Sequence, residues 1–206
     1  MPGAPLSREP AAANWFIALA VPPLPAWEGL TRGLPEGMRR FAPLDRHLTL
    51  AFLGPCGPGS AGRAWDALAG RRHPPIEATA GAWRAMGPRD RPSAYALTLA
   101  RGQGPAADLI ADWGDRARIA AGLPPAARRP LPHITLARPP RRRAAALRQP
   151  MRVWMEQAQL PPGAFRLETV ALYTWSGDRA ERLFRIVAER PLDSPESPSS
   201  PCRNAP

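Results

Sequence analysis

The stretches His47-Leu48-Thr49-Leu50-Ala51 and His133-Ile134-Thr135-Leu136-Ala137 share one pattern of histidine, aliphatic, threonine, aliphatic and alanine. Each is a short run of strand-forming residues that a turn signal ends, Gly54-Pro55 after the first and Pro139-Pro140 after the second. The sequence therefore predicts two equivalent β-strands that each begin with a histidine.

Side chains alternate between the two faces of a strand, so the histidine and the threonine of each motif share one face. The aliphatic residues lie on the opposite face, where they can pack in a core. If the histidine faces of both strands line one cleft, two imidazoles and two hydroxyls converge there.

This set of groups suits the cleavage of a phosphodiester. One imidazole removes a proton from the nucleophile and the other gives a proton to the leaving oxygen, because a histidine pKa of roughly 6.5 allows both forms near neutral pH. We predict His47 and His133 as this pair, with Thr49 and Thr135 donating hydrogen bonds to the phosphate oxygens. The mechanism requires no metal and no cofactor.

The segments around the motifs repeat in the same order. We expect strands at 15–20, 47–53, 76–86, 95–100, 133–137, 165–175 and 183–188, with helices at 25–34, 60–68, 105–117 and 151–159. Strand, helix, motif strand, helix and hairpin strand thus occur twice. This predicts an α+β fold with two pseudo-symmetric lobes, each with a small antiparallel sheet, a cleft between them, and a last strand that returns to the first lobe.

Composition limits the class of protein. The 206 residues contain no apolar run long enough to span a membrane, and the N-terminus lacks a secretory pattern, so we expect a soluble, cytoplasmic protein. Residues 1–13 and 193–206 are poor in large apolar groups and are predicted to be disordered tails of a domain at 14–192. Cys56 and Cys202 are predicted to be free thiols.

A net charge of +11 favours a polyanionic partner. All 28 basic residues are arginine, which also fits a coding bias towards GC-rich codons and weakens that inference. The run Arg141-Arg142-Arg143 and the loop residue His73 are interpreted as solvated surface rather than catalytic groups.

The two motifs resemble the paired motifs of the two-histidine phosphoesterase superfamily, and the chain is similar within it to the bacterial and archaeal RNA 2',3'-cyclic phosphodiesterases, also called 2'-5' RNA ligases. The resemblance covers roughly residues 14–192. It implies hydrolysis of a 2',3'-cyclic phosphate end to a 2'-phosphate, with His47 as proton donor to the departing O3' and His133 as proton acceptor that activates water. It further implies an RNA or oligonucleotide partner, a minor 2'-5' ligase activity and a monomer.

The family pattern also implies a phosphate or ribose contact from an arginine shortly after the second motif, where this chain has Arg138. The residues that precede each motif, Leu44-Asp45-Arg46 and Leu131-Pro132, depart from the family pattern, which leaves the substrate preference open. A phosphodiesterase of small cyclic nucleotides or 2'-5' oligonucleotides and a non-catalytic basic RNA-binding module both remain as alternatives.

Overall fold

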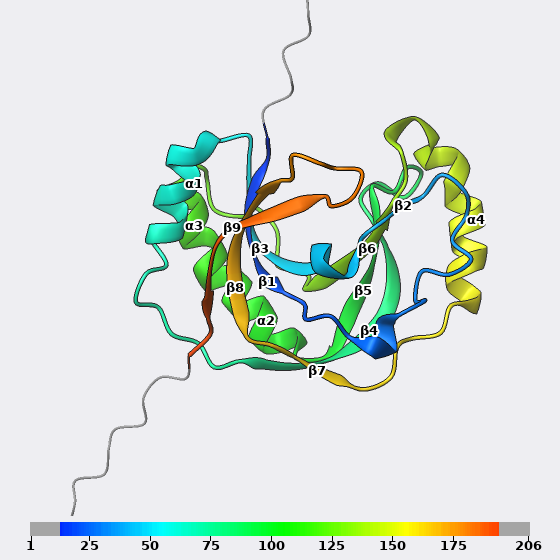
Figure 1. Cartoon of the computed structure of the whole chain (residues 1–206), viewed down its shortest axis with the longest axis horizontal. Helices are drawn as coiled ribbons and strands as arrows, with labels where there is room; N and C mark the ends of the chain where they lie inside the picture. The colour runs from blue at the N-terminus through cyan, green and yellow to red at the C-terminus, as the bar shows by residue number, and fades with distance from the viewer. Residues whose placement is uncertain (1–12, 194–206) are drawn as a thin grey trace, which may run out of the picture.

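The two histidine motifs begin two strands that lie side by side in one sheet (Figure 1). The computed structural model describes residues 13–193. Strand β3 (His47–Gly54) and strand β6 (His133–Arg138) pair antiparallel at Leu48 and Ile134. Both predicted motif strands are therefore present, and they are neighbours.

The remaining strands extend the sheet on both sides of this pair. The order is β7-β4-β5-β6-β3-β1-β8-β9, β2 pairs with β6, and each pair is antiparallel. The bounds are β1 Trp15–Ala20, β2 Arg39–Arg40, β4 Ile76–Met86, β5 Ala94–Arg101, β7 Ala164–Leu167, β8 Thr169–Trp175 and β9 Phe184–Pro191. The result is a mixed α/β fold around a curled antiparallel sheet.

The sheet is continuous, whereas we expected a separate small sheet in each of two lobes. The strand after the first motif strand, β4, pairs with β5 of the second half, and β8 pairs with β1 of the first half. The last strand, β9, pairs with β8 and, in the part of the chain that the structure describes, not with a strand of the first half, so the expectation that it returns to pair with the first lobe was wrong. Because one strand of each half pairs with the other half, the two halves share one sheet. The pseudo-symmetric arrangement of two lobes stays a prediction.

All four predicted helices differ from the structure in their bounds. The segment predicted as a helix at 25–34 forms only the 3₁₀ turn η1 (Pro25–Trp27), since Gly29 and Gly33 adopt left-handed backbone angles that interrupt a helix. Helix α1 (Gly57–Asp66) begins three residues before the predicted start at 60 and ends two residues before the predicted end at 68. The predicted helix at 105–117 is α2 (Gln103–Leu109), a π-helical turn η3 (Ile110–Gly114) and α3 (Asp115–Ala120).

Helix α4 (Ala144–Gln157) begins well before the predicted start at 151 and contains Pro150. A proline inside a helix removes one hydrogen bond and normally ends the helix. Here Ala144, Leu147 and Met151 form a buried stripe, and Met151 packs with Tyr95 and Ala137 of the sheet. Tertiary packing of this face explains why the helix continues through the proline.

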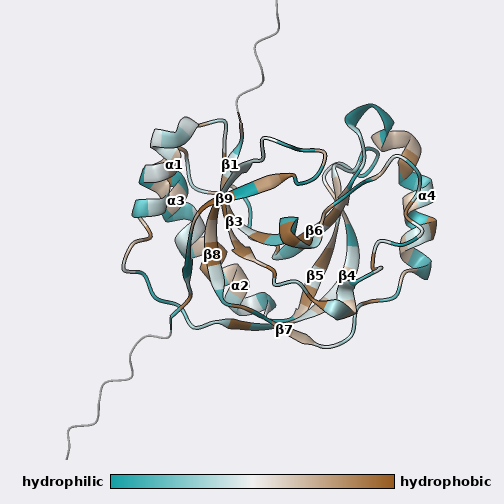
Figure 2. Cartoon of the chain, in the orientation of Figure 1, coloured by the Kyte–Doolittle hydropathy of each residue, from teal (hydrophilic) through white to brown (hydrophobic). Residues whose placement is uncertain are grey.

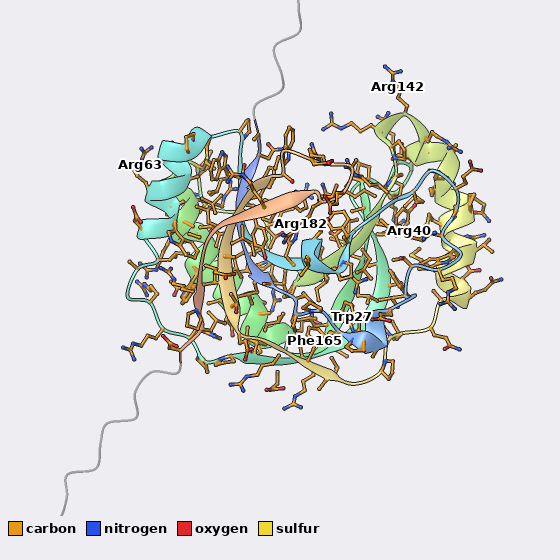
Figure 3. The ribbon with its side chains drawn as sticks, in the orientation of Figure 1. Trp27, Arg40, Arg63, Arg142, Phe165 and Arg182 are labelled. Carbon is orange, nitrogen blue, oxygen red and sulfur yellow. The ribbon has the colours of Figure 1, made fainter. Side chains whose placement is uncertain are left out.

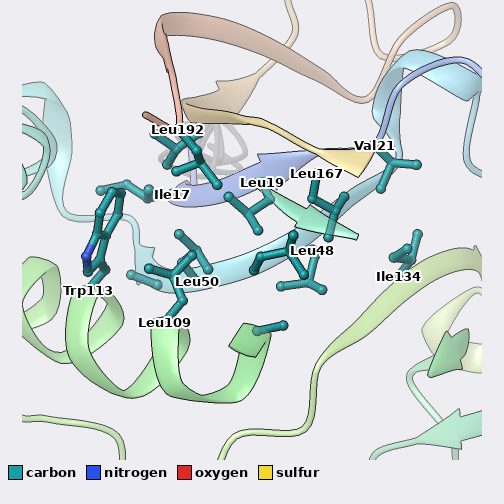
Figure 4. Packing of buried hydrophobic residues seen from close by; sticks show 14 of the residues in the cluster. Ile17, Leu19, Val21, Leu48, Leu50, Leu109, Trp113, Ile134, Leu167 and Leu192 are labelled. Atoms are coloured by element: carbon teal, nitrogen blue, oxygen red, sulfur yellow. The ribbon is translucent and has the colours of Figure 1, made fainter. Parts of the chain in front are cut away.

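The main core lies between the sheet and the helices α1 to α3. Figure 4 shows Ile17, Leu19, Leu48 and Leu50 of the sheet facing Leu109 and Trp113 of the helical segment. Apolar residues follow the strands and the inner faces of the helices in Figure 2. Leu48, Leu50, Ile134 and Leu136 all belong to the buried core, so the aliphatic faces of the two motif strands pack as predicted.

Within residues 13–193, no helix is long and apolar enough to cross a lipid bilayer.

Candidate active site

The two motif histidines are held by the same local hydrogen bond. Nδ1 of His47 lies 2.7 Å from the carbonyl oxygen of Asp45, and Nδ1 of His133 lies 2.7 Å from that of Leu131. A carbonyl oxygen can only accept, so each Nδ1 carries a hydrogen and donates it. This fixes one tautomer in both rings and leaves each Nε2 without a hydrogen-bond partner among the described residues, ready to accept or donate a proton.

Four aromatic rings surround His47. Its ring centroid lies 4.6 Å from that of Phe16, 5.4 Å from Phe184, 5.5 Å from Tyr173 and 6.3 Å from Phe41. Phe16 and Tyr173 stack almost in parallel at 4.9 Å, which fixes this wall of the site. The imidazole is therefore held rigidly, with 7% of its surface exposed.

Burial in this aromatic surrounding lowers the pKa of His47 to about 4. The hydrogen bond to the Asp45 carbonyl acts in the opposite direction, and the nearby charges of Arg138 and His133 lower the pKa further. His47 is consequently neutral at pH 7 in the free protein. The effect of His133 on His47 shows that the two imidazoles lie close to each other.

His133 has a more open environment. It is only half-buried, at the start of β6 opposite Thr98 of β5, and it makes no contact with an aromatic ring among residues 13–193. The two motifs thus share their backbone geometry but not their surroundings.

Asp45 holds His47 through its backbone carbonyl and is itself held through its carboxylate. Its buried carboxylate accepts hydrogen bonds from the backbone N–H groups of Leu183, at 3.0 and 3.2 Å, and Phe184, at 3.2 Å. Its carbonyl accepts the Nδ1 hydrogen of His47. Asp45, in the 3₁₀ turn η2 (Pro43–Asp45), therefore ties the start of β3 to the start of β9.

The two threonines lie on the same strand faces as the histidines. Thr49 is half-buried opposite Ala18 of β1, and Thr135 is buried opposite Ala96 of β5. Neither hydroxyl has a hydrogen-bond partner among the described residues, so both can bind a ligand. The structure brings His47, His133, Thr49 and Thr135 together on paired strands.

Arg138 lies further away, at the far end of β6. Its Cζ atom is 5.4 Å from the centroid of Phe41, and Phe41 in turn faces His47. The backbone N–H of Phe41 donates to the carbonyl of Leu136 at 2.9 Å, which holds this ring against β6. Arg138 is therefore directed towards the histidines across Phe41 rather than packed between them.

Sequence reasoning missed Asp45, Phe16, Phe41 and Phe184 as parts of the site. Phe16 could have been found, because it alternates with the core residues Ile17 and Leu19 and must face the other side of β1. Phe41 lies in an irregular segment whose pattern gives no such signal. Tyr173 is buried, with its ring against that of His47.

His73 lies outside this constellation. Its Nδ1 approaches the carbonyl oxygen of Pro74 at 2.6 Å, and its ring contacts Trp113 of η3. Nowhere between residues 13 and 193 do three or more His, Cys, Asp or Glu side chains gather as a metal ion would need.

The fold is similar to that of several solved phosphoesterases. No protein-family model and no curated protein matched the chain. E. coli LigT complexed with 3'-AMP aligns with 88% of this chain and 98% of its own, at a TM-score of 0.64 and 22% identity. A protein described as a phosphoesterase covers 88% of this chain and 99% of its own (TM-score 0.61, 22% identity), and TT0787 of Thermus thermophilus covers 87% and 97% (0.58, 20%).

This chain therefore has the fold of LigT and of the phosphoesterase.

Proposed function

We propose that this chain is a two-histidine phosphoesterase that hydrolyses 2',3'-cyclic phosphate ends of RNA to 2'-phosphomonoesters. The observation that carries the proposal is the pair of imidazoles, on adjacent strands, that donate through Nδ1 to a carbonyl two residues earlier. Both Nε2 atoms are left free for proton transfer, and two threonine hydroxyls lie on the same strand faces. In this proposal the reacting phosphate binds beside these four side chains.

The reaction requires two proton transfers. Nε2 of His133 accepts a proton from water, which attacks phosphorus, and Nε2 of His47 gives a proton to the departing O3'. Thr49 and Thr135 donate hydrogen bonds to the non-bridging oxygens, where charge persists in the transition state. The bond that forms is O–P from water and the bond that breaks is P–O3', so the product keeps its 2'-phosphate.

The lowered pKa of His47 constrains this assignment. In the free protein the ring is neutral at pH 7, so the donor role requires that the bound substrate favour its protonated form. The anionic cyclic phosphate provides this, since a negative charge beside an imidazole raises its pKa. Burial then makes the protonated His47 a strong acid, which suits transfer to an alkoxide leaving group.

The substrate class rests on three observations. The chain carries a net charge of +11, Arg138 points towards the site, and LigT has been solved with 3'-AMP and with NADP+. We propose RNA ends as substrate, acted on by a monomer, with 2'-5' joining as a minor activity in which a 5'-hydroxyl attacks phosphorus in place of water and O3' leaves. A mononucleotide cyclic phosphate or a 2'-5' oligonucleotide is the second candidate, and the LigT complexes with small nucleotides favour it.

The test is to incubate the purified protein with an RNA that ends in a 2',3'-cyclic phosphate, with and without EDTA. We expect a 2'-phosphate product at a rate that EDTA leaves unchanged. A 3'-phosphate product would show that the other oxygen leaves, and inhibition by EDTA would overturn the metal-free mechanism. RNA binding without turnover would favour the non-catalytic alternative.

A further inference from the structure

A cavity lined by arginines lies at the far end of β6. A cavity of about 550 Å³ opens between the turn of the β4–β5 hairpin and the segment that leads from β6 into α4. Arg91 comes from the hairpin, Arg138 from the end of β6, and Arg141 from the 3₁₀ turn η4 (Arg141–Arg143). Three arginines from three segments thus line one cavity whose lining includes neither His47 nor His133.

The arginines around this cavity are not neutralised within the protein. Among residues 13–193, none of Arg91, Arg138 and Arg141 forms an ion pair, and their guanidinium groups make no hydrogen bond. Asp90, next to Arg91 in the chain, does not line the cavity. Mutually repelling cations without a counter-charge favour the binding of an anion.

The cavity also has an apolar floor and a fixed shape. Pro92, Pro139 and Ala144 are buried and line it. Ser93 closes the hairpin, with its N–H donating to the Met86 carbonyl at 2.8 Å and its hydroxyl to the same oxygen at 3.3 Å. A positive rim over an apolar floor matches a nucleotide, whose phosphate is charged and whose ribose and base present flat apolar faces.

The distance to the histidines defines which phosphate could bind there. Along β6 the Cα atoms of His133 and Arg138 are about 17 Å apart, at the usual rise of a strand, and the cavity lining contains neither histidine. The cavity is therefore distinct from the histidine site, although the charge of Arg138 also reaches His47. The guanidinium of Arg138 lies over Phe41, and Phe41 faces His47, so one buried ring stands between this arginine and the histidine site.

We propose that this cavity binds a backbone phosphate of the RNA strand, 5' to the nucleotide that carries the cyclic phosphate. The proposal rests on the proposed function and deepens it, because it makes the protein an enzyme of oligonucleotide ends rather than of mononucleotides. Arg91 and Arg141 act only on longer substrates, whereas the chemistry at His47 and His133 is the same for both.

The test compares a mononucleotide and a trinucleotide that carry the same cyclic phosphate. For the wild type, we expect kcat/KM to be about tenfold higher for the trinucleotide at low salt, with a steeper salt dependence. The double variant Arg91→Ala/Arg141→Ala should lose this advantage, lose about one unit of the salt slope, and open the mononucleotide at the wild-type rate.

A charge-matched control separates the cavity from general attraction. The double variant Arg63→Ala/Arg142→Ala removes the same net charge from exposed side chains that do not line the cavity, and Figure 3 places them on opposite sides of the molecule. It should retain the preference for the trinucleotide. Equal losses in both double variants, or no preference in the wild type, would overturn the proposal.

A binding measurement distinguishes failure of the cavity from failure of the proposed function. Fluorescence anisotropy with an uncleavable trinucleotide that ends in a 3'-phosphate reports on the cavity without turnover. If the wild type opens neither cyclic phosphate, the proposed function fails. The cavity proposal then stands if Arg91→Ala/Arg141→Ala weakens trinucleotide binding more than the control does, and falls if it does not.

Discussion

The two motif strands have the same sequence pattern and the same backbone anchor, but they place their histidines in different surroundings. His47 is enclosed by Phe16, Phe41, Tyr173 and Phe184, whereas His133 is half-buried and has no aromatic neighbour among the described residues. Asp45, whose carbonyl binds Nδ1 of His47, accepts hydrogen bonds through its carboxylate from the backbone N–H groups of Leu183 and Phe184. The residue at the equivalent place before His133 is Leu131, which has no polar side chain.

This difference shows how one repeated motif can provide two chemical roles. Local geometry fixes the tautomer in both rings, and the tertiary surroundings then set the pKa of His47. Four aromatic rings disfavour a positive charge on His47, so this ring releases its proton more readily than an exposed histidine would. The different surroundings of the two histidines therefore come from tertiary packing rather than from the motif.

Removal of either imidazole is the largest expected effect. His47→Ala and His133→Ala should each lower kcat by about 10²- to 10⁴-fold, because each removes one of the two proton transfers. The control is His73→Ala, the third histidine, which lies outside the site and should leave turnover unchanged. Single-turnover rates with a cyclic-phosphate RNA provide the measurement, and near-normal turnover of either motif variant would refute the assignment.

The environment of His47 should make stability depend on pH. Its pKa is lowered to about 4 in the folded protein, so between about pH 6.5 and 4 the unfolded chain binds a proton that the folded protein does not. The free energy of unfolding should therefore fall as the pH is lowered through this range, by about 3 kcal/mol from this group, and be unaffected by it above pH 6.5.

The variant His47→Asn isolates this effect, since its amide can donate to the Asp45 carbonyl but does not titrate. Urea unfolding at pH 7 and pH 4.5 should show a smaller loss of stability in the variant than in the wild type. An equal loss in both would mean that His47 does not carry a lowered pKa.

Replacing Asp45 should lower stability and kcat more than replacing Leu131, the residue at the equivalent position before His133. Asp45→Ala leaves the buried N–H groups of Leu183 and Phe184 unpaired, which should cost about 2–3 kcal/mol of stability. It should also lower kcat about tenfold, because His47 loses its fixed position. Asp45→Asn keeps one acceptor oxygen and should recover part of both losses.

Leu131→Ala is the matched change in the other half, and it should have the smaller effect on kcat. Thermal unfolding and kcat measured on the same preparations provide the comparison. Equal sensitivity at both positions would remove the proposed asymmetry between the two motifs.

Replacing either threonine should have the smallest effect on kcat/KM, and the two replacements should lower it to a similar extent. Thr49→Val and Thr135→Val keep the side-chain volume and remove one hydrogen bond to the phosphate, which should lower kcat/KM about tenfold each. A loss confined to one variant would show that only that hydroxyl contacts the phosphate. Retained folding, measured by circular dichroism, is the control.

Several parts of the fold could be predicted from sequence because they depend on local patterns. Alternation of side chains placed His47 with Thr49 and His133 with Thr135, and it assigned Leu48 and Ile134 to the core. The helix boundaries were less accurate. Two left-handed glycines reduced the expected helix after Pro25 to one turn, and packing of Met151 extended α4 through Pro150.

The sequence by itself determined the two motif strands, the face on which each histidine lies and the order of the elements, since these follow from side-chain alternation and turn residues close in the chain. Only the tertiary structure decided that β4 and β8 exchange between the halves, that Asp45 binds the N–H groups of Leu183 and Phe184, and that four aromatic rings enclose His47. These contacts join residues far apart in sequence, where no local pattern specifies which side chains meet. The physical reason is that burial and desolvation, which set the pKa of His47, are properties of the assembled core.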